Sequence, residues 1–588
     1  MLDREVIRHQ LVSRRTFILT SGKVGILSAL LGRMLYLQLI KGNEYQILSD
    51  KNRISLVITP PERGLIEDRN GFVISENRPS YFLKLDRRQS TTYKESLANL
   101  FELLKLDDDA KRSIFAKLKR TSYRTPVNLA QDISWENVAL IEERIHDLSG
   151  IYIEATSLRK YNFPEIYSHI TGYVGKISEA EQQELGQSAN EFQMGKTGIE
   201  KQYEEVLQGE LGYRKIEVDA HGLYINELEK VDSIKGNSIN LNIDDNCQQH
   251  LHSVMNPIGS SAIVMDVSNG EVIASCSMPV FNPNEFVGGI SSANWKKLMN
   301  DPYKPLINKV VQTQYPPGSN FKLITVLAAL EAGILPTQKF FCSGSVAIGS
   351  RDFHCWHLSG HGELDMIDSI KHSCNCYMFN LGKLIGGDRI LAVARRFGYG
   401  SLTGVDLPGE QKGFVPDREW KLKNFKFDWS LGDTFNIAIG QGALLSTPIQ
   451  QVRMVAAFAN GGKLLRPRFA QSCEQESIEI SIKTEHLAII REGMFRAVNI
   501  EGGTAFRSKA NNTILAGKTG TSQVQAKKNA HDDLSRDSVR WQSRNHALFV
   551  GFVPFDNPIY AVSVIVDHGG GGAKSAAPIA KEICDHLF

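Results

Sequence analysis

The apolar residues at the start of the chain form a nearly continuous run from Thr16 to Ile40, which only Lys23 and Arg33 interrupt with charge. A run of this kind has roughly the ~20 residues needed to cross a bilayer. Lys23 lies near one end, from which a lysine side chain can extend to the headgroups, whereas Arg33 is harder to accommodate. The pattern predicts a transmembrane helix over 16–40, with a buried or interfacial helix as the alternative.

Residues 41–235 alternate short β-rich runs with polar helical ones. Residues 54–74 contain strand-like segments on both sides of turn signals. Residues 93–120 and 134–145 carry apolar positions at helical spacing. The stretch 229–238 is polar and turn-like, as domain boundaries usually are. We therefore expect an elongated α/β pedestal domain over 41–235.

From residue 236 onward the pattern changes to strands at both ends with helices between them. Residues 261–278 indicate two strands joined by a hairpin at Ser268-Asn269-Gly270. Near the C-terminus, 545–555 and 559–568 indicate two more strands. This order predicts an α+β domain over 236–588, with a mostly antiparallel sheet flanked by helices.

Composition and charge narrow the class of protein. The 588 residues are too many for one core, so a multidomain chain is expected. The net charge is +2 and the basic residues form no long runs, which argues against nucleic acid as a partner. The eight cysteines are too few for a disulfide scaffold.

The basic residues around the apolar run predict its orientation. Four arginines precede the run, at positions 4, 8, 14 and 15, so the positive-inside rule places a tail of residues 1–15 in the cytoplasm. No cleavage site of small residues follows, which predicts an uncleaved signal anchor. We expect a single-pass protein of the inner membrane with its bulk in the periplasm.

A first candidate for chemistry is the stretch YPPGSNFK, residues 315–322. After the Pro-Pro-Gly turn, Ser319 lies where an apolar helix begins, and Lys322 follows on the same face, one turn later. A serine hydroxyl needs a base to become a nucleophile. Lys322 can be that base if burial and a second cation lower its pKa. Taken alone, a Ser-x-x-Lys pair is weak, and Ser157 to Lys160 matches it too.

Two further short motifs follow in order. Ser373-Cys374-Asn375 is a Ser-x-Asn match, a pattern that recurs elsewhere in the chain. Lys518-Thr519-Gly520 lies within the second of two GKTG stretches; the first is Gly195–Gly198. A phosphate-binding loop is excluded for both, because the required earlier glycine is an asparagine in each.

The ordered set Ser-x-x-Lys, Ser-x-Asn, Lys-Thr-Gly is far more specific than its parts, and it is the active-site signature of the penicillin-recognising serine acyltransferases. From about residue 50 to the C-terminus the chain resembles the penicillin-binding proteins, in particular the class B, elongation-specific group represented by penicillin-binding protein 2. The stretches that carry this resemblance are RGLIEDRNG (63–71), RKYNFPEIYSHITGYVG (159–175), GKTGIEKQYEEVLQGELG (195–212), FNPNEF (281–286) and YPPGSNFK.

The resemblance implies a peptidoglycan D,D-transpeptidase that β-lactams inhibit covalently and that needs no cofactor for acyl transfer. Ser319 would attack the D-Ala–D-Ala bond of a stem peptide, and Lys322 would take its proton. Ser373 would relay the proton to the leaving amine, and Asn375 would bind the substrate backbone. Lys518 would keep Lys322 neutral. The remaining substrate-binding residues it implies are Thr519, Gly520 and Thr521, with the backbone N–H groups of Ser319 and Thr521 as the oxyanion hole.

The first GKTG lies outside this ordered set. By resemblance it belongs to a structural motif of the pedestal, so we expect Gly195 and Gly198 to make a turn before a helix. Lys196 is then expected to be solvated.

A cysteine–histidine cluster lies between the first two motifs. Cys342, Cys355, His361 and Cys374 are spaced C-x12-C-x5-H-x12-C, and three thiolates with an imidazole suit tetrahedral zinc. The resemblance supports a structural zinc site here, since related proteins have one with more acidic ligands. A Cys342–Cys355 disulfide and buried free thiols are the alternatives.

Several functions share the three motifs. A β-lactamase or D,D-carboxypeptidase transfers the acyl group to water, and a penicillin-sensing receptor would need a larger cytoplasmic domain. A division-specific class B transpeptidase is the nearest alternative. The resemblance implies a polytopic membrane glycan polymerase of the elongation machinery as partner, contacted through the anchor and residues 41–235.

Overall fold

The computed structural model describes residues 2–41, 54–123, 125–178, 181, 193–218, 224–256, 258–525 and 539–588. They form two compact units. The first consists of residues 1–61, 80–156 and 210–234; the second consists of residues 62–79, 157–209 and 235–588. The chain passes between them within β3 (Val73–Leu85) and returns within β5 (Ile151–Tyr161). Segments near 70 and 200 thus fold with the C-terminal part of the chain.

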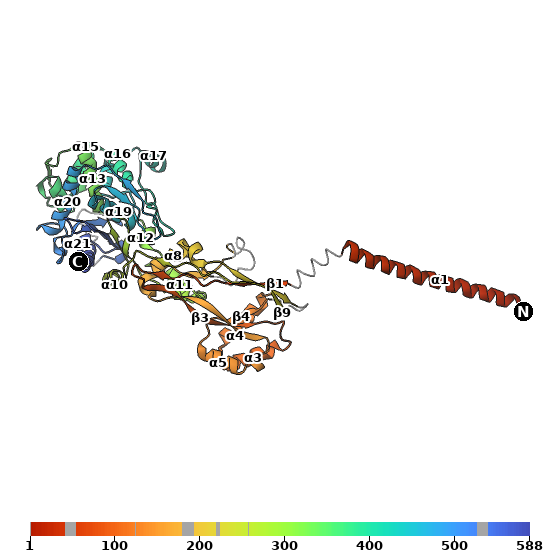
Figure 1. Cartoon of the computed structure of the whole chain (residues 1–588). Helices are drawn as coiled ribbons and strands as arrows, with labels where there is room; N and C mark the ends of the chain where they lie inside the picture. Colours follow the sequence, from red (N-terminus) through yellow and green to blue (C-terminus); the bar gives the residue numbers. More distant parts are fainter. Residues whose placement is uncertain are drawn as a thin grey trace. The chain divides into compact units, whose positions relative to one another are not determined.

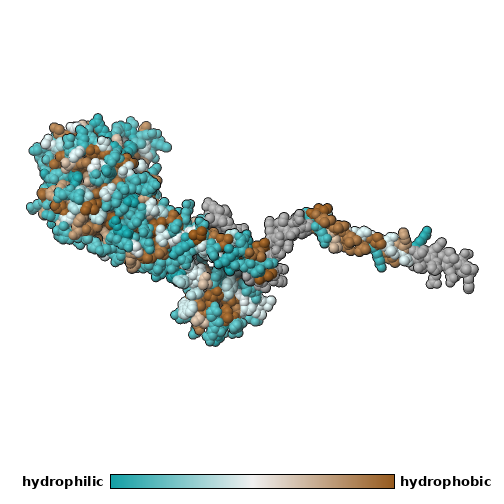
Figure 2. Space-filling model, viewed as in Figure 1, coloured by the Kyte–Doolittle hydropathy of each residue, from teal (hydrophilic) through white to brown (hydrophobic). Residues whose placement is uncertain are grey.

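The N-terminal helix α1 (Leu2–Leu35) continues into a π-helical turn, η1 (Tyr36–Ile40). Residues Thr16–Ile40 have a mean hydropathy of 1.4, and none of the most apolar stretch is buried against the protein. Hydrophobic residues, drawn in brown, make up much of this part of the helix, with hydrophilic ones in teal between them (Figure 2). The segment expected to span the membrane is therefore a helix of suitable length and composition.

The first unit packs helices against short strands around leucine and isoleucine side chains, among them Leu83, Leu97 and Ile141. The predicted helical stretch 93–120 is two helices, because Asp107 caps the second one by accepting from the Ala110 N–H. A separate antiparallel sheet has the order β1-β8-β9. The remaining elements of this unit are β1 (Ile54–Thr59), α3 (Tyr93–Leu103), α4 (Asp108–Arg120), β4 (Val127–Ala130), α5 (Trp135–Glu143), η2 (Ile145–Asp147), β8 (Gly212–Val218) and β9 (Tyr224–Val231).

The centre of the second unit is a five-stranded sheet with the order β12-β11-β21-β20-β19. Every neighbouring pair is antiparallel, so the predicted antiparallel sheet is confirmed. The predicted hairpin turn at Gly270 (φ +81°) joins β11 to β12. The strands are β11 (Ser260–Asp266), β12 (Val272–Met278), β19 (Ala516–Ser522), β20 (His546–Val553) and β21 (Tyr560–Val566).

The two faces of this sheet belong to different cores. Ala262 and Val264 pack with α10 (Asp245–Val254) and α21 (Gly572–Leu587). Ile263 and Met265 pack with the core around α13 (Lys322–Glu331) and α19 (Pro448–Ala459). Successive strand residues point to opposite faces, which produces this alternation. Figure 1 shows α13, α15 (Asn375–Ile385) and α16 (Gly387–Arg396) together on one side of the unit, and α21 on the other.

The chain between β12 and β19 forms further helices, short strands and turns. They are η4 (Pro283–Glu285), α11 (Ser292–Asn300), α12 (Lys309–Gln312), η5 (Gly318–Phe321), α13 (Lys322–Glu331), β13 (Phe340–Cys342), β14 (Ser345–Ile348), β15 (Arg351–His354), β16 (Gly362–Leu364), α14 (Met366–Lys371), α15 (Asn375–Ile385), α16 (Gly387–Arg396), α17 (Arg418–Phe425), α18 (Leu431–Ala438), α19 (Pro448–Ala459), β17 (Lys463–Leu465), β18 (Ser477–Glu479), α20 (Thr484–Asn499) and η6 (Phe506–Ser508). The turn η7 (Trp541–Ser543) precedes β20.

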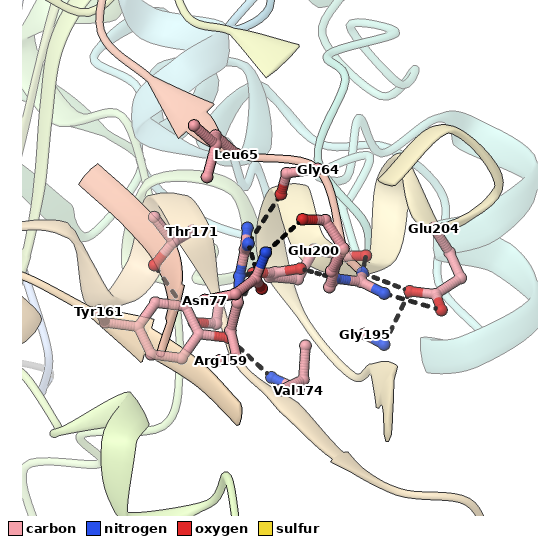
Figure 3. Close-up of polar contacts among 12 residues, drawn as sticks. Gly64, Leu65, Asn77, Arg159, Tyr161, Thr171, Val174, Gly195, Glu200 and Glu204 are labelled. Atoms are coloured by element: carbon pink, nitrogen blue, oxygen red, sulfur yellow. Dashed lines mark hydrogen bonds and ion pairs between the residues drawn. The ribbon is translucent and has the colours of Figure 1, made fainter. Parts of the chain in front are cut away.

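A buried ion-pair network joins the N-terminal segments of the second unit (Figure 3). The Glu200 carboxylate is fully buried and accepts from Arg159 Nε and Arg63 Nε, each at 2.6 Å. Arg63 also pairs with Glu204, and Arg159 Nη1 donates to the Gly64 carbonyl at 2.7 Å. Buried charges are tolerated when they are paired and hydrogen-bonded in this way. The network connects three of the stretches quoted above, which lie far apart in the sequence.

The elements around this network are short. They are β2 (Ile66–Glu67), α6 (Pro164–Thr171), β6 (Val174–Lys176), β7 (Gln193–Gly195), α8 (Gly198–Gln202), α9 (Glu204–Gln208) and β10 (Ile239–Asn240). The parallel pairing of β10 with β2 aligns Ile239 with Ile66. It links the segment that enters the sheet domain to the segment that starts at residue 62.

Candidate active site

The first motif forms a tight turn that leads into a buried helix. Ser319 is the second residue of the 3-10 turn η5, and Lys322 is the first residue of α13. The prediction that a helix begins here is confirmed, with a 3-10 first turn. Gly318 has φ +54°, and a Cβ there would lie 2.6 Å from the Thr521 carbonyl oxygen. The turn therefore needs glycine before Ser319, because the backbone of β19 lies directly against it.

The second motif lies beside Lys322. The Lys322 Nζ donates to the Ser373 carbonyl oxygen at 2.7 Å, to the Ser373 Oγ at 3.2 Å and to the Asn375 Oδ1 at 2.7 Å. Ser373 is buried and has φ +53°, a conformation that a non-glycine residue adopts only when its surroundings hold it there. In this conformation both of its oxygens face the lysine.

The third motif lies on the edge strand β19. Lys518 Nζ donates to the Ser373 Oγ at 2.7 Å and to the Thr519 carbonyl at 2.9 Å. Gly520 leaves room for Asn320, whose Oδ1 would be 2.9 Å from a Cβ at that position. Side chains alternate along a strand, so Thr519 and Thr521 lie on the face of β19 opposite to Lys518 and Gly520. The Thr519 hydroxyl hydrogen-bonds that of Thr504 at 2.9 Å.

Two lysines thus converge on one serine hydroxyl. Both are fully buried. Burial lowers the pKa of Lys322 to about 8, and the thiols of Cys355, Cys374 and Cys376 oppose that shift. Burial and the neighbouring Lys322 ammonium lower the pKa of Lys518 well below its ordinary value. Two ammonium groups this close disfavour each other's charged form, so the pair releases a proton easily.

The structure brings the predicted site residues together. Lys322, Ser373, Asn375 and Lys518 are connected by hydrogen bonds, and Ser319 lies one turn before Lys322. The other predicted residues, Thr519, Gly520 and Thr521, follow Lys518 on β19.

Two residues that hold the site were missed. Thr504 bonds Thr519, and Gln441 Nε2 donates to the Thr521 carbonyl at 2.9 Å. Neither belongs to a motif. The sequence signal closest to Gln441 is its position between two glycines after an apolar helical run.

The first GKTG has a different environment. Gly195 ends β7, and Gly198 starts α8 with φ +61°, so the predicted turn before a helix is confirmed. The expectation that Lys196 is solvated is wrong, because its Nζ forms an ion pair with Glu181 at 2.5 Å. The side chain is only 20% exposed. This lysine therefore has a structural partner that spacing alone did not reveal.

The predicted zinc ligands also meet. One ligand atom from each of Cys342, Cys355, His361 and Cys374 lies within 4.8 Å of the other three. The Sγ atoms of Cys342 and Cys355 are each 3.6 Å from the His361 Nδ1. All eight cysteines are free thiols, so no disulfide joins Cys342 to Cys355. Hydrogen bonds lower the pKa of the Cys355 thiol, and the bond with Cys374 has the largest effect. The hydrogen bond with Cys355 raises the pKa of His361.

Comparison with known proteins defines the family. Residues 260–585 match the family model "Penicillin binding protein transpeptidase domain", and residues 58–241 match "Penicillin-binding Protein dimerisation domain". The first match alone covers more than half of the chain. The chain therefore belongs to the penicillin-binding proteins that carry a transpeptidase domain, a family of serine acyltransferases.

Individual relatives show which group of penicillin-binding proteins the chain resembles. "Peptidoglycan D,D-transpeptidase MrdA" of Haemophilus influenzae is 30% identical over all of this chain and 93% of its own length. The protein of the same name from Escherichia coli K12 is 31% identical over 98% of this chain and 94% of its own. The structure of penicillin-binding protein 2 (PBP2) of Helicobacter pylori in complex with MreC superposes with a TM-score of 0.81 at 30% identity, over 91% of this chain and 99% of that one. The resemblance to the penicillin-binding protein 2 group is confirmed.

Proposed function

We propose that the chain is an elongation-specific, class B peptidoglycan D,D-transpeptidase that cross-links stem peptides through a serine acyl-enzyme. The observation that carries this is the convergence of Lys322 and Lys518 on the Ser373 hydroxyl, beside Ser319. A nucleophilic serine needs a base whose pKa lies near neutral pH. Burial lowers the pKa of Lys322 to about 8. Acyl transfer in this family needs no cofactor.

The acylation step assigns a role to each residue. The Ser319 Oγ bonds to the carbonyl carbon of the penultimate D-alanine while its proton passes to neutral Lys322. The carbon–nitrogen bond to the terminal D-alanine then breaks. Lys322 returns the proton through the Ser373 hydroxyl, which lies 3.2 Å away, to the leaving amine. A β-lactam follows the same first step, but its amine stays attached to the acyl group.

The second step transfers the acyl group. An amine of a neighbouring stem peptide attacks the ester carbon, loses its proton to the base, and releases the Ser319 hydroxyl. In the first step Lys518, Thr519 and Thr521 bind the carboxylate of the terminal D-alanine, and Asn375 binds the backbone of the donor stem peptide. The N–H groups of Ser319 and Thr521 stabilise the oxyanion in both steps.

We further propose a structural zinc ion at Cys342, Cys355, His361 and Cys374. The donor set fits, since three soft sulfur ligands and an imidazole nitrogen suit a closed tetrahedral site. The alternative of buried free thiols has the same geometry, and metal content separates the two. A zinc ion there would supply no chemistry to the acyl transfer. Its ligands would fix the chain around Ser373 and Asn375, which flank Cys374.

We also propose the placement of the chain in the cell. Helix α1 would cross the inner membrane once over residues 16–40, with residues 1–15 in the cytoplasm. Residues 41–235 and 236–588 would form the pedestal and the catalytic domain in the periplasm, where cell-wall synthesis maintains the rod shape. The support is the arginine-rich N-terminus and the apolar helix.

A polytopic glycan polymerase of the elongation machinery is the proposed membrane partner. One similar structure, with a TM-score of 0.70 at 25% identity, is described as "Structural coordination of polymerization and crosslinking by a peptidoglycan synthase complex". Another is PBP2 with MreC. These descriptions belong to the relatives, and they support an equivalent assembly here.

The reaction itself separates transpeptidase from carboxypeptidase. Purified protein with nascent peptidoglycan and its polymerase should release D-alanine and form cross-linked peptides, whereas Ser319→Ala should do neither. D-Alanine release with only shortened, uncross-linked peptides would instead identify a carboxypeptidase.

A further inference from the structure

Three backbone segments meet next to Ser319. The Gly318 N–H donates to the Gly440 carbonyl at 2.9 Å. Gly440 has φ +70°, and a Cβ there would lie 2.2 Å from the Gly318 carbonyl oxygen. Gly318 in turn contacts Thr521. This junction of Gly318, Gly440 and Thr521 is therefore too close for any side chain at either glycine.

Gln441 fixes the third member of this junction. Its Nε2 donates to the Thr521 carbonyl at 2.9 Å, and its Oε1 accepts from the Gln523 N–H at 3.4 Å. The N–H and C=O of one strand residue point to the same edge. Within the part of the chain that the structure describes, β19 is the last strand of the sheet. The Thr521 N–H therefore lies on the same side of the strand as the carbonyl that Gln441 holds. The side chain thus sets the orientation of the backbone at Thr521.

The end of helix α18 holds Gly440 and Gln441 in place. The Gly440 N–H donates to the Ile437 carbonyl and the Gln441 N–H donates to the Asn436 carbonyl, each at 2.9 Å. A glycine in the left-handed conformation after a helix, with hydrogen bonds back to the last turn, is a stable helix end. The Gln441 side chain therefore extends from a fixed backbone.

The same stretch of chain also holds the residues around the nucleophile. The Asn320 amide donates to Gln451 Oε1 at 2.9 Å, and Gln451 Nε2 donates to Ser446 Oγ at 3.1 Å. Ser446 and Tyr315 exchange two backbone hydrogen bonds of 2.8 Å. Residues 440–451 thus contact both the turn that carries Ser319 and the strand that carries Thr521.

We propose that Gln441 is a positioning residue that sets the distance between the two oxyanion-hole donors, the N–H groups of Ser319 and Thr521. This inference rests on the proposed function. Donors stabilise a tetrahedral intermediate only when they are fixed before the charge develops. A misplacement of about 1 Å can reduce a rate on the order of 100-fold. Gln441 acts on the reaction through Thr521, which it holds against the Gly318 turn.

The test compares Gln441→Ala and Gln441→Glu with the wild type, using a labelled penicillin. Glutamate is nearly isosteric, but its carboxylate cannot donate to the Thr521 carbonyl. In both variants the first-order acylation rate constant should fall by roughly 10- to 100-fold. The dissociation constant of the complex that precedes acylation should change by less than about threefold, because ground-state contacts are kept.

A boronic acid gives a second readout. It bonds reversibly to Ser319 as a tetrahedral adduct, with one oxygen where the oxyanion would lie. Its affinity should fall by the same factor as the acylation rate constant. A variant that was only less stable would not lose boronic acid affinity and acylation rate by the same factor. The unfolding temperature of both variants should stay near that of the wild type.

Gln471→Ala is the matched control, since the Gln471 amide also donates to a backbone carbonyl, that of Leu241, at 3.4 Å. It should acylate at the wild-type rate. If Gln441→Ala acylates within twofold of the wild type, or weakens only the complex that precedes acylation, the positioning role is wrong. If the wild type itself is not acylated, the proposed function fails, and this inference fails with it.

Discussion

Lys322 and Lys518 place two amines within hydrogen-bond distance of one serine hydroxyl, and this crowding is the chemical centre of the site. Lys322 is held by the Ser373 carbonyl and the Asn375 side chain, both at 2.7 Å. Burial of both lysines makes a neutral amine accessible near physiological pH. Ser373 connects the two, so it is suited to move a proton between base and leaving group.

The first prediction is a pH dependence. Because the folded pKa of Lys322 is lowered from 10.5 to about 8, the fraction of neutral base rises with pH below that value. The acylation rate constant should rise about tenfold per pH unit below 8 and level off above it. Stopped-flow acylation by a labelled penicillin between pH 6 and 9.5 measures this. A flat profile would contradict Lys322 as the base.

The second prediction concerns Lys518. Lys518→Ala removes the amine that lies 2.7 Å from the Ser373 hydroxyl, so acylation should slow by roughly 100-fold or more. Lys383→Ala, an exposed lysine on α15, is the control and should acylate normally. If the two variants were acylated at equal rates, Lys518 would have no role in acylation.

At this scale the ordered motifs predicted Ser319, Lys322, Ser373, Asn375 and Lys518, because each is a chemistry-bearing residue at a fixed spacing. Gln441 and Thr504 could not be predicted. They act through backbone and hydroxyl contacts across the fold, which leave no local spacing in the sequence. The ion pair of Lys196 was missed for the same reason.

Among the elements, the short segments around Glu200 depend on one buried carboxylate. Glu200 is fully buried between Arg159 and Arg63, and the Arg159 side chain is only 1% exposed. Removing one partner of a buried ion pair leaves an uncompensated charge in a region of low dielectric. The network therefore holds the segments from 62–79 and 157–209 together as part of the second unit.

Glu200→Ala should accordingly lower the free energy of unfolding by about 3 to 5 kcal/mol. Denaturant titration of the soluble part of the chain, followed by tryptophan fluorescence, measures this change. The control is Asp388→Ala, which breaks an exposed pair with Arg418 and should cost under about 1 kcal/mol. A loss in Glu200→Ala no larger than the control would show that the network contributes little.

The cysteine–histidine cluster in and around β13 to β16 leads to a prediction about zinc content. Purified protein should contain one zinc ion per chain, and Cys342→Ser or His361→Ala should lose it and unfold at a lower temperature. Cys473→Ser changes a buried cysteine outside the cluster and should keep the metal. Metal analysis by mass spectrometry decides the point. Zinc-free wild-type protein that is fully active would end the zinc proposal.

For the whole molecule, the antiparallel sheet and the helical span followed directly from the hydrophobic pattern. The membership of 62–79 and 157–209 in the second unit could not be predicted. It depends on pairings such as Ile66 with Ile239 and Arg159 with Glu200, between segments far apart in the sequence. The predicted domain boundary at residue 235 stays a prediction. The match to the dimerisation domain ends at residue 241, and the match to the transpeptidase domain begins at residue 260.

Cell shape tests the function at this scale. Depletion of the protein should turn rods into round cells, because lateral wall synthesis would lose its cross-linking enzyme. Expression of the wild type should restore the rods, and Ser319→Ala should not. Long filaments with normal diameter would instead indicate the division-specific alternative.

The most direct test is to locate the covalent acyl group. Wild-type and Ser319→Ala proteins are treated with a labelled penicillin and digested, and the labelled peptide is sequenced by mass spectrometry. The label should sit on Ser319 in the wild type and be absent from the variant, whose unfolding temperature should be unchanged. A label on another residue, such as Ser157 or Ser373, or an undiminished label in Ser319→Ala, would contradict the serine acyl-enzyme at this site.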